Sequence, residues 1–262
     1  MNLNLTGKTA LVCGSTQGLG WASALELSKL GANIILMARN EEKLKEVLPL
    51  LDKSAGQLHQ YLVADFNQPA MVLEAVQQYT QQGGIVHILV NNTGGPAGGK
   101  AIDAHTDAFL TAFNNHLINN HQLVQAVVPG MKNAGFGRII NIISTSVKQP
   151  IAGLGVSNTI RAAVANWSKT LSLELGQYGI TVNNVLPGFT NTVRAEYVLK
   201  KKATDSGKTE DQVMKELIAE IPVGRIGEPE EFGAAVAFLS SPAAAYINGI
   251  NLPVDGGRTG CL

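Results

Sequence analysis

The chain contains few cysteines, and their scarcity excludes whole classes of site. Only two of the 262 residues are cysteine, Cys13 and Cys261. Two cysteines are too few for a disulfide framework, and no spacing resembles a metal site, so we expect none. Cys13 follows the apolar residues Ala10, Leu11 and Val12, a context that predicts a buried free thiol.

Net charge is also lacking, because 20 Lys and Arg balance 20 Asp and Glu. Balanced charge gives no electrostatic attraction for nucleic acid or for an anionic membrane surface. No apolar run approaches the length that spans a bilayer. The segment Met1 to Ala10 has no basic start followed by a long apolar run, so it does not resemble a secretory signal. We therefore expect a cytoplasmic protein without nucleic-acid or membrane partners.

Apolar residues are abundant at 45% of the chain, and they come in short runs between longer amphipathic segments. Short runs that are apolar on both faces are typical of parallel strands covered by helices on both sides. The sequence therefore predicts an α/β fold: a single-domain, Rossmann-like, doubly wound parallel sheet of about seven strands. The expected strands are Thr9–Gly14, Asn33–Ala38, His59–Asp65, Ile85–Asn92, Arg138–Ser144, Ile180–Pro187 and Ile250–Val254. The expected helices are Trp21–Gly31, Glu41–Leu51, Asp107–Asn133, Val156–Tyr178 and Glu228–Ser240, with another between the third and fourth strands.

One domain spans residues 1–262, and only residues 190–222 interrupt its regular alternation. This stretch contains the polar run KKKATDSGKTEDQ. Such an insertion can form a lid over a substrate. It can equally form a solvated pair of surface helices, and the sequence does not decide between them.

A glycine-rich turn, CGSTQGLG, follows the first expected strand and opens the first helix. Glycines at this place allow a tight turn and a close approach of the backbone to a pyrophosphate, which the helix N-terminus attracts. The context makes a plain strand-to-helix turn the weaker alternative. The predicted phosphate-binding residues are Gly14, Ser15, Gly18, Leu19 and Gly20.

Arg39 stands at the end of the second strand, where NAD-binding proteins carry an acidic residue for the ribose. An arginine there suits the additional phosphate of NADP, so NADP is expected and NAD is the less favoured cofactor. The alternative is an exposed arginine at the start of a loop.

These motifs, together with NNTG, PGFTNT, GRIGEPEEFGAAVAFLSS and GINLPVDGG, resemble the short-chain dehydrogenase/reductase superfamily, near its 3-oxoacyl carrier-protein reductases. The match runs from about Leu5 to Gly257. Cys13 departs from it, because the family usually has Thr there. The resemblance implies a nicotinamide dinucleotide, a small carbonyl or hydroxy substrate, and a homodimer or homotetramer. It also implies cofactor contacts at Asp65, Asn91, Gly94, Pro187, Gly188 and Thr192.

The sequence differs from the family at the catalytic residues. The family's tetrad is Asn, Ser, Tyr and Lys, and Ser144 matches its Ser. The Tyr and Lys positions hold Ser157 and Arg161, and the Asn position holds His116 or, if the register shifts by one, Asn115. The candidate catalytic residues are therefore Ser144, Ser157, Arg161 and His116.

Two functions remain open from these residues. The first is an NADP-dependent oxidoreductase of the carbonyl reductase type with an atypical acid–base set. Ser157 is a weak acid, and Arg161 stabilises an oxyanion without shuttling protons. His116 can restore part of the lost acid if its imidazole titrates near neutral pH, or it can be a helix residue with no catalytic part. The second is a nucleotide-binding sensor or scaffold that has lost catalysis. Because the guanidinium of Arg161 can hold a carboxylate or phosphate by two hydrogen bonds, an acidic substrate is expected for the first. The alternative is that Arg161 only holds the ribose of the cofactor and contacts no substrate.

Overall fold

Seven strands form one parallel sheet, in the order β3-β2-β1-β4-β5-β6-β7, in a computed structural model that describes residues 1–261. Every neighbouring pair is parallel, and the order reverses between β1 and β4. The predicted doubly wound sheet is confirmed. The strands are β1 (Thr9–Cys13), β2 (Asn33–Ala38), β3 (Gln60–Val63), β4 (Ile88–Asn91), β5 (Gly137–Ile142), β6 (Ile180–Pro187) and β7 (Asn251–Val254).

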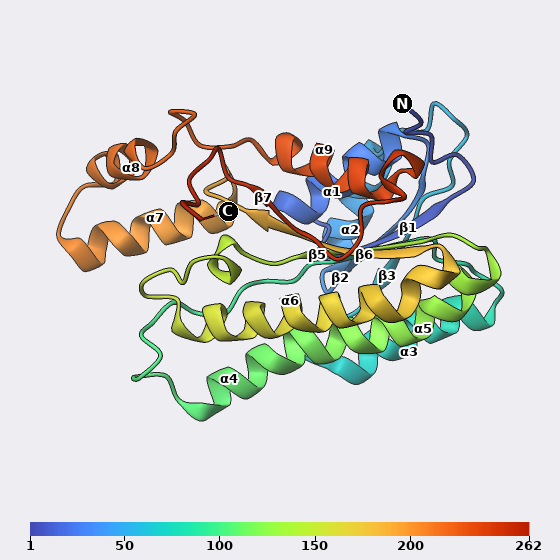
Figure 1. The fold of residues 1–262 in the computed structure, drawn as a ribbon, viewed down its shortest axis with the longest axis horizontal. Coiled ribbons are helices and arrows are strands. Elements are labelled where there is room, and N and C mark those ends of the chain that lie inside the picture. Colours follow the sequence, from blue (N-terminus) through green and yellow to red (C-terminus); the bar gives the residue numbers. More distant parts are fainter. Residues whose placement is uncertain (262) are drawn as a thin grey trace.

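Helices cover both faces of the sheet, as Figure 1 shows. The helices α1, α2 and α9 lie on one face, and α3 to α6 lie on the other. Their bounds are α1 (Gly18–Lys29), α2 (Glu41–Val47), α3 (Pro69–Gln81), α4 (Thr106–Phe113), α5 (Asn119–Asn133), α6 (Gly155–Leu175), α7 (Val193–Ser206), α8 (Glu210–Ala219) and α9 (Pro229–Ser240).

Two of the expected helices are shortened or divided for local reasons. The helix expected over Glu41–Leu51 ends at Val47 and continues as a 3-10 turn, since Pro49 cannot continue the α-helical hydrogen bonds. The helix expected over Asp107–Asn133 is divided by a π-helical turn, η2 (Asn114–Ile118), between α4 and α5. Turns of this kind inside helices occur frequently at functional sites.

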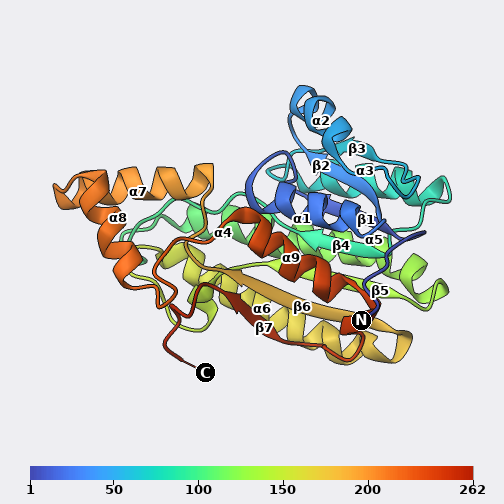
Figure 2. The ribbon, with the colours of Figure 1, turned by 90° about the horizontal axis from the view of Figure 1, so that it is seen from above.

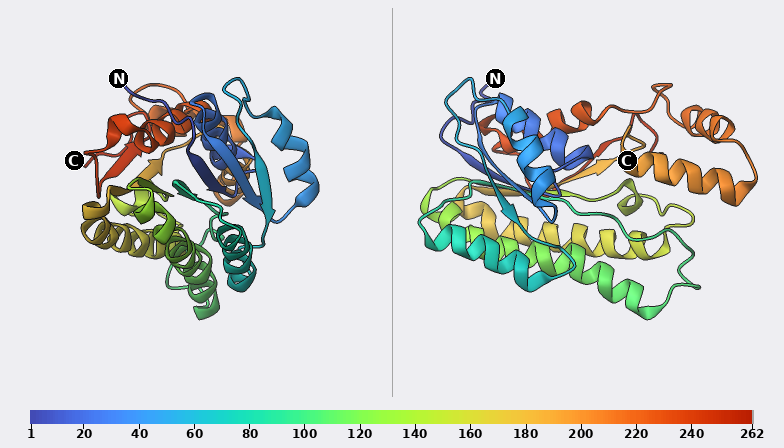
Figure 3. Two further views of the ribbon diagram at one scale, coloured as in Figure 1. Left: turned by 90° about the vertical axis from the view of Figure 1, so that its right-hand side faces the viewer. Right: turned by 180° about the vertical axis from the view of Figure 1, so that it is seen from behind.

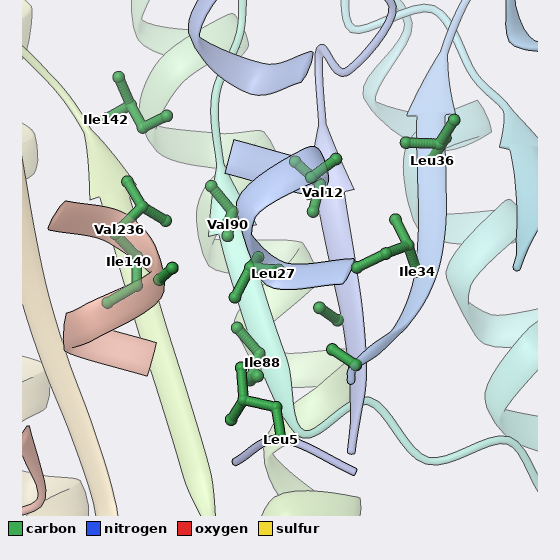
Figure 4. Close-up of a cluster of buried hydrophobic side chains, with 14 of the residues drawn as sticks. Leu5, Val12, Leu27, Ile34, Leu36, Ile88, Val90, Ile140, Ile142 and Val236 are labelled. Atoms are coloured by element: carbon green, nitrogen blue, oxygen red, sulfur yellow. The ribbon is translucent and has the colours of Figure 1, made fainter. Parts of the chain in front are cut away.

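Alternate residues of β1 enter different hydrophobic clusters, which explains why its sequence is apolar throughout. Ala10 and Val12 pack with the cluster beneath α1 and α9, whereas Leu11 and Cys13 pack with the cluster beneath α3 and α5. Figure 4 shows the first cluster around Val12. The Cys13 thiol is free and buried as predicted, and burial raises its pKa to about 12.

A row of asparagines crosses four neighbouring strands at the same register. Asn91 on β4 donates from Nδ2 to Asn141 Oδ1 on β5 at 2.8 Å. Asn141 donates to Asn184 Oδ1 on β6 at 3.0 Å, and Asn184 donates to Asn251 Oδ1 on β7 at 2.7 Å. Asn141 Nδ2 also lies 3.2 Å from Ser168 Oγ on α6. The three donations between asparagines run in one direction, from β4 towards β7.

Residues 190–222 form the helix pair α7 and α8, which extends beyond the main body in Figures 2 and 3. The two helices share a small hydrophobic cluster of their own, formed by Leu199, Ala203, Val213 and Leu217. The structure therefore has a surface helix pair here. A lid movement of this pair stays a prediction.

Within residues 1–261, no helix combines the length and the apolar composition that crossing a membrane requires. Across the same residues, no three His, Cys, Asp or Glu side chains gather closely enough to hold a metal ion.

Candidate active site

The glycine-rich turn joins the carboxyl end of β1 to α1, at the point where the strand order reverses. Gly14 and Gly18 both have a φ of +57°, a conformation that favours glycine. A Cβ on Gly14 would lie 2.8 Å from Asn92 Nδ2, and a Cβ on Gly20 would collide with the carbonyl oxygen of Gly14. The turn therefore needs glycine at these positions, and the backbone lies bare at the N-terminus of α1. Ligands of open α/β sheets bind at such a reversal point.

Of the two asparagines in NNTG, Asn92 is the one that contacts the glycine turn. Its Nδ2 donates to the carbonyl oxygens of Cys13 and Gly14, each at 3.2 Å. Asn91, which the sequence analysis named, is only 1% exposed and pairs inside the sheet with Asn141. Asn92 therefore fixes the shape of the turn, and Asn91 fixes the neighbouring strand.

The other predicted cofactor residues near the first three strands lie at the carboxyl edge of the sheet. Ser15 is fully buried, and its Oγ accepts a hydrogen bond from Met37 N at 3.0 Å, so this hydroxyl ties the turn to β2. Leu19 packs against the core beneath α1. Arg39 is exposed directly after β2. Asp65, after β3, accepts from the backbone and side chain of Asn67, each at 3.0 Å.

Thr192 brings the segment after β6 against the glycine turn. β6 ends at Pro187, Gly188 follows, and Thr192 caps α7 by accepting a hydrogen bond from Ala195 N at 3.2 Å. Thr192 Cγ2 lies 3.6 Å from the position that a Cβ on Gly18 would take. A groove of about 270 Å³ opens here, and its lining includes the first residues of α1, α7 and α9. The N-termini of three helices therefore meet at one groove, and its lining also includes Glu196 and Glu230. Because these carboxylates oppose an anion, only the N-terminus of α1 at the glycine turn is assigned to a phosphate.

Arg161 is the most deeply buried of the charged candidates. It projects from α6 and is 8% exposed, and its Nη1 donates to the carbonyl oxygen of Ile142 at 3.1 Å. Its Nε is buried without a hydrogen-bond partner within residues 1–261. Burial, and to a lesser extent Arg194, lower the pKa of Arg161 to about 10. The guanidinium therefore remains charged at neutral pH.

Ser144 and Ser157 lie on two elements that meet near Arg161. Ser144 follows β5 and caps a short 3-10 turn, where its Oγ accepts from Ser146 N at 3.1 Å. This hydroxyl comes two residues after Ile142, the carbonyl partner of Arg161. Ser157 is partly exposed in the first turn of α6, one helical turn before Arg161.

His116, rather than Asn115, lies close enough to Arg161 for the two charges to interact. Asn115 turns away and donates to Asn67 Oδ1 at 2.9 Å. His116 is 2% exposed in the π-helical turn, and burial, followed by the charge of Arg161, lowers its pKa to about 2. The expectation that His116 titrates near neutral pH is therefore wrong, because an imidazolium there would be desolvated beside a fixed cation. A neutral imidazole can donate an N–H but supplies no proton from a charged form.

Arg194 is a second guanidinium in this region that the sequence analysis missed. It stands in the first turn of α7, and its Nη2 donates to the carbonyl oxygen of Pro96 at 2.9 Å. A cation is unfavourable at a helix N-terminus. That misplaced charge, two residues after Thr192, is the signal that could have identified Arg194.

Comparison with known proteins places this geometry in a family. A family model described as Enoyl-(Acyl carrier protein) reductase matches residues 14–259. The chain belongs to the short-chain dehydrogenase/reductase family. Both the glycine turn and the segment around Thr192 lie within the matched residues.

Members of this family whose names give different substrates are similar to this protein over almost its whole length. The 3-oxoacyl-[acyl-carrier-protein] reductase FabG of Pseudomonas aeruginosa is 34% identical over 97% of this chain and 98% of its own. The L-sorbose reductase of Gluconobacter frateurii, solved with NADPH and L-sorbose, matches with a TM-score of 0.93 and 30% identity over 100% of both chains. A gluconate 5-dehydrogenase of Burkholderia cenocepacia, solved with NADP and tartrate, has a TM-score of 0.88 and 28% identity over 100% of this chain and 98% of that one.

Proposed function

We propose that this protein is an NADP-dependent oxidoreductase that acts on a carbonyl or hydroxyl group of a small molecule. The observation that carries the proposal is the glycine turn, where Gly14, Gly18 and Gly20 leave the backbone bare at the N-terminus of α1. NADPH and NADP are named for two of the similar solved structures. Those relatives act on different substrates, so none of their substrates is carried over to this chain.

The residues present fit a phosphorylated dinucleotide. The N–H groups of the glycine turn and the dipole of α1 favour a pyrophosphate at the N-terminus of α1. Arg39 is exposed at the end of β2, where it can pair with the additional phosphate of NADP. Asp65 and Gly94 remain proposed contacts at the same edge of the sheet. When bound, the cofactor supplies or accepts the hydride.

The protein's own part in the reaction is to hold and stabilise the carbonyl oxygen. Ser144 offers a hydroxyl at the end of β5, and Arg161 offers a fixed positive charge that stabilises a developing alkoxide. Ser157 adds a neutral hydrogen bond one turn earlier on α6. Neutral His116 can donate an N–H but no readily released proton. This atypical set lacks a strong general acid. The loss of such an acid typically lowers the rate by about 10²–10⁴-fold.

A second function is favoured by one observation. His116 has a pKa of about 2 and Arg161 one of about 10, so neither titrates near neutral pH. A nucleotide-binding sensor needs the cofactor groove but no acid–base pair. If the double variant Ser157→Tyr with Arg161→Lys reduces ketones while the natural protein reduces none, the sensor becomes the better description.

The choice of cofactor is tested by removing one charge. Arg39→Ala should weaken NADPH binding by about tenfold and leave NADH binding unchanged, because only NADPH carries the phosphate that the guanidinium pairs with. Fluorescence titration with both cofactors measures this. Lys43→Ala, an exposed lysine on the following helix, serves as a control for general loss of positive charge. Equal affinities for both cofactors in the natural protein would contradict the proposal.

A homodimer or homotetramer remains our proposal for the assembly. Of the small residues of α6 that suit close helix contacts, Val164 and Ala165 pack inwards with Ile143 and Leu186, whereas Ala162 is exposed. We expect sedimentation at micromolar concentration to give a mass of at least two chains. A monomer would refute this prediction. The cytoplasmic location likewise stays a prediction.

A further inference from the structure

Arg161 carries a buried positive charge that no acidic side chain neutralises. The residue is only 8% exposed. Within residues 1–261 no carboxylate comes within ion-pair distance of its guanidinium. Its Nε also lacks a hydrogen-bond partner there. Buried charges in proteins are almost always paired, because an isolated one is costly to remove from water. The natural partner of Arg161 is therefore absent from the chain itself.

Arg194 adds a second positive charge at the same place. Gly95, in the loop after β4, lies between the two guanidinium groups. A Cβ on Gly95 would lie 3.7 Å from Arg161 Nη2 and 3.7 Å from Arg194 Nη2, and apart from Gly94 and Pro96 no other residue would come within 4 Å. Gly95 has no side chain, so the point of the loop that faces both nitrogens is not covered by one. The proximity of Arg194 also contributes to the lowered pKa of Arg161.

The three elements that form this point hold it in place. Arg161 is fixed to the end of β5 through the carbonyl oxygen of Ile142. Arg194 is fixed to the loop after β4 through the carbonyl oxygen of Pro96. The N-terminus of α7, from which Arg194 projects, adds a further positive partial charge. Two like charges are thus held near one open point, an arrangement that costs free energy unless an anion completes it.

From this arrangement we infer that Arg161 and Arg194 together bind a carboxylate of the substrate above Gly95. The inference rests on the proposed function, since it assigns the substrate class of the same site. The substrate is a small oxo acid or hydroxy acid whose carboxylate bridges the two guanidinium groups. Its carbonyl carbon then lies towards Ser144, which comes two residues after Ile142, the last residue of β5. The phosphates of the cofactor have separate places, at the glycine turn and Arg39.

Paired ligands that differ only in charge test this inference. The protein saturated with NADPH is titrated with pyruvate and acetoacetate, and in parallel with pyruvamide and acetoacetamide, and binding is read from calorimetry and from the shift in Tm. We expect the acids to bind at least about tenfold more tightly than the amides, as a charge-assisted hydrogen bond would give. Equal binding of acids and amides, including no binding of any of the four, would overturn the inference.

Two variants then locate the carboxylate. Arg194→Gln removes one charge, and Gly95→Ala fills the open point while leaving both charges in place. Each should weaken binding of the acids by about tenfold or more and change NADPH affinity little. Lys200→Gln removes a charge from the same helix α7 outside the site, and Gly99→Ala adds a methyl group in the same loop where no atom lies within 4 Å. Both controls should bind the acids as the natural protein does.

The outcomes separate this inference from the proposed function. If Arg194→Gln and Gly95→Ala weaken NADPH while acid binding is unchanged, the two arginines hold a cofactor phosphate and the inference is wrong. If the acids bind selectively but NADPH binds nowhere, the carboxylate site stands and the proposed function fails.

Discussion

An alanine at position 20 should weaken NADPH binding by about a hundredfold, or about 2.7 kcal/mol. For the stability of the helix, propensity alone predicts a gain, since alanine in place of a helical glycine is favourable by about 1 kcal/mol. In this fold, however, the new methyl group would collide with the carbonyl oxygen of Gly14 and would lie 2.7 Å from Asn92 Nδ2. The first turn of α1 must therefore move away from the glycine turn, and the N–H groups that face the groove move with it. We also expect a loss of about 1–3 kcal/mol in the free energy of unfolding from the overpacking.

Fluorescence titration with NADPH and urea unfolding together measure the two effects. The matched control is Gly130→Ala in α5, where the new Cβ would make an ordinary contact of 3.5 Å with Ile85 Cγ2. This control should bind NADPH normally and unfold at the same or a higher urea concentration. Normal NADPH affinity in Gly20→Ala would mean that the close approach of α1 to Gly14 is not needed for binding.

The second large effect concerns the acid sensitivity of the fold. His116 has a pKa of about 2 in the folded chain, against an ordinary value near 6.5. Above pH 6.5 the imidazole is neutral in both states and contributes nothing. Below pH 6.5 only the unfolded chain takes up the proton, so stability falls by about 1.4 kcal/mol per pH unit. At pH 5 the contribution of His116 is a loss of about 2 kcal/mol relative to pH 7.

Urea unfolding of the natural protein and of His116→Gln at pH 7 and pH 5 tests this directly. The variant should lose about 2 kcal/mol less than the natural protein over that interval. His59 and His87 also have pKa values lowered mainly by burial, so the variant keeps part of the decline. His105→Gln, at a side chain that is 81% exposed, is the control. An identical decline in the natural protein and His116→Gln would show that this imidazole is not excluded from protonation.

The sheet could be predicted because strands that are buried on both faces appear in the sequence as short runs of apolar residues. Runs such as Asn33–Ala38 and Ile180–Pro187 match β2 and β6 in full. Most ends of the other strands lie one to three residues inside the expected ones, whereas β5 begins one residue earlier than expected. The π-helical turn Asn114–Ile118 was missed, since one extra residue in a turn barely changes the apolar periodicity.

The site was harder to predict, because its properties depend on what packs around each residue. The sequence left His116 and Asn115 as alternatives for one position, and the lowered pKa of His116 follows from burial that no local pattern reveals. Asn91 and Asn92 are adjacent in the sequence, yet the alternation of side chains along β4 sends one into the sheet and the other to the glycine turn. Arg194 meets Arg161 only because the segment after β6 folds back over the loop after β4.

The row of asparagines across β4, β5, β6 and β7 has a consequence for how the chain reaches one native state. A slip of any of these strands by a single residue would turn its amide to the opposite face, against the apolar side chains beneath α1 and α9. The displaced amide and the one it abandons would both be buried without partners, each at a cost of about 1–3 kcal/mol. The free energy of the native register is thus lower than that of any slipped register by an amount that valines at the same four positions would not provide. The buried polar groups of these four strands therefore specify a single alignment of about half the sheet.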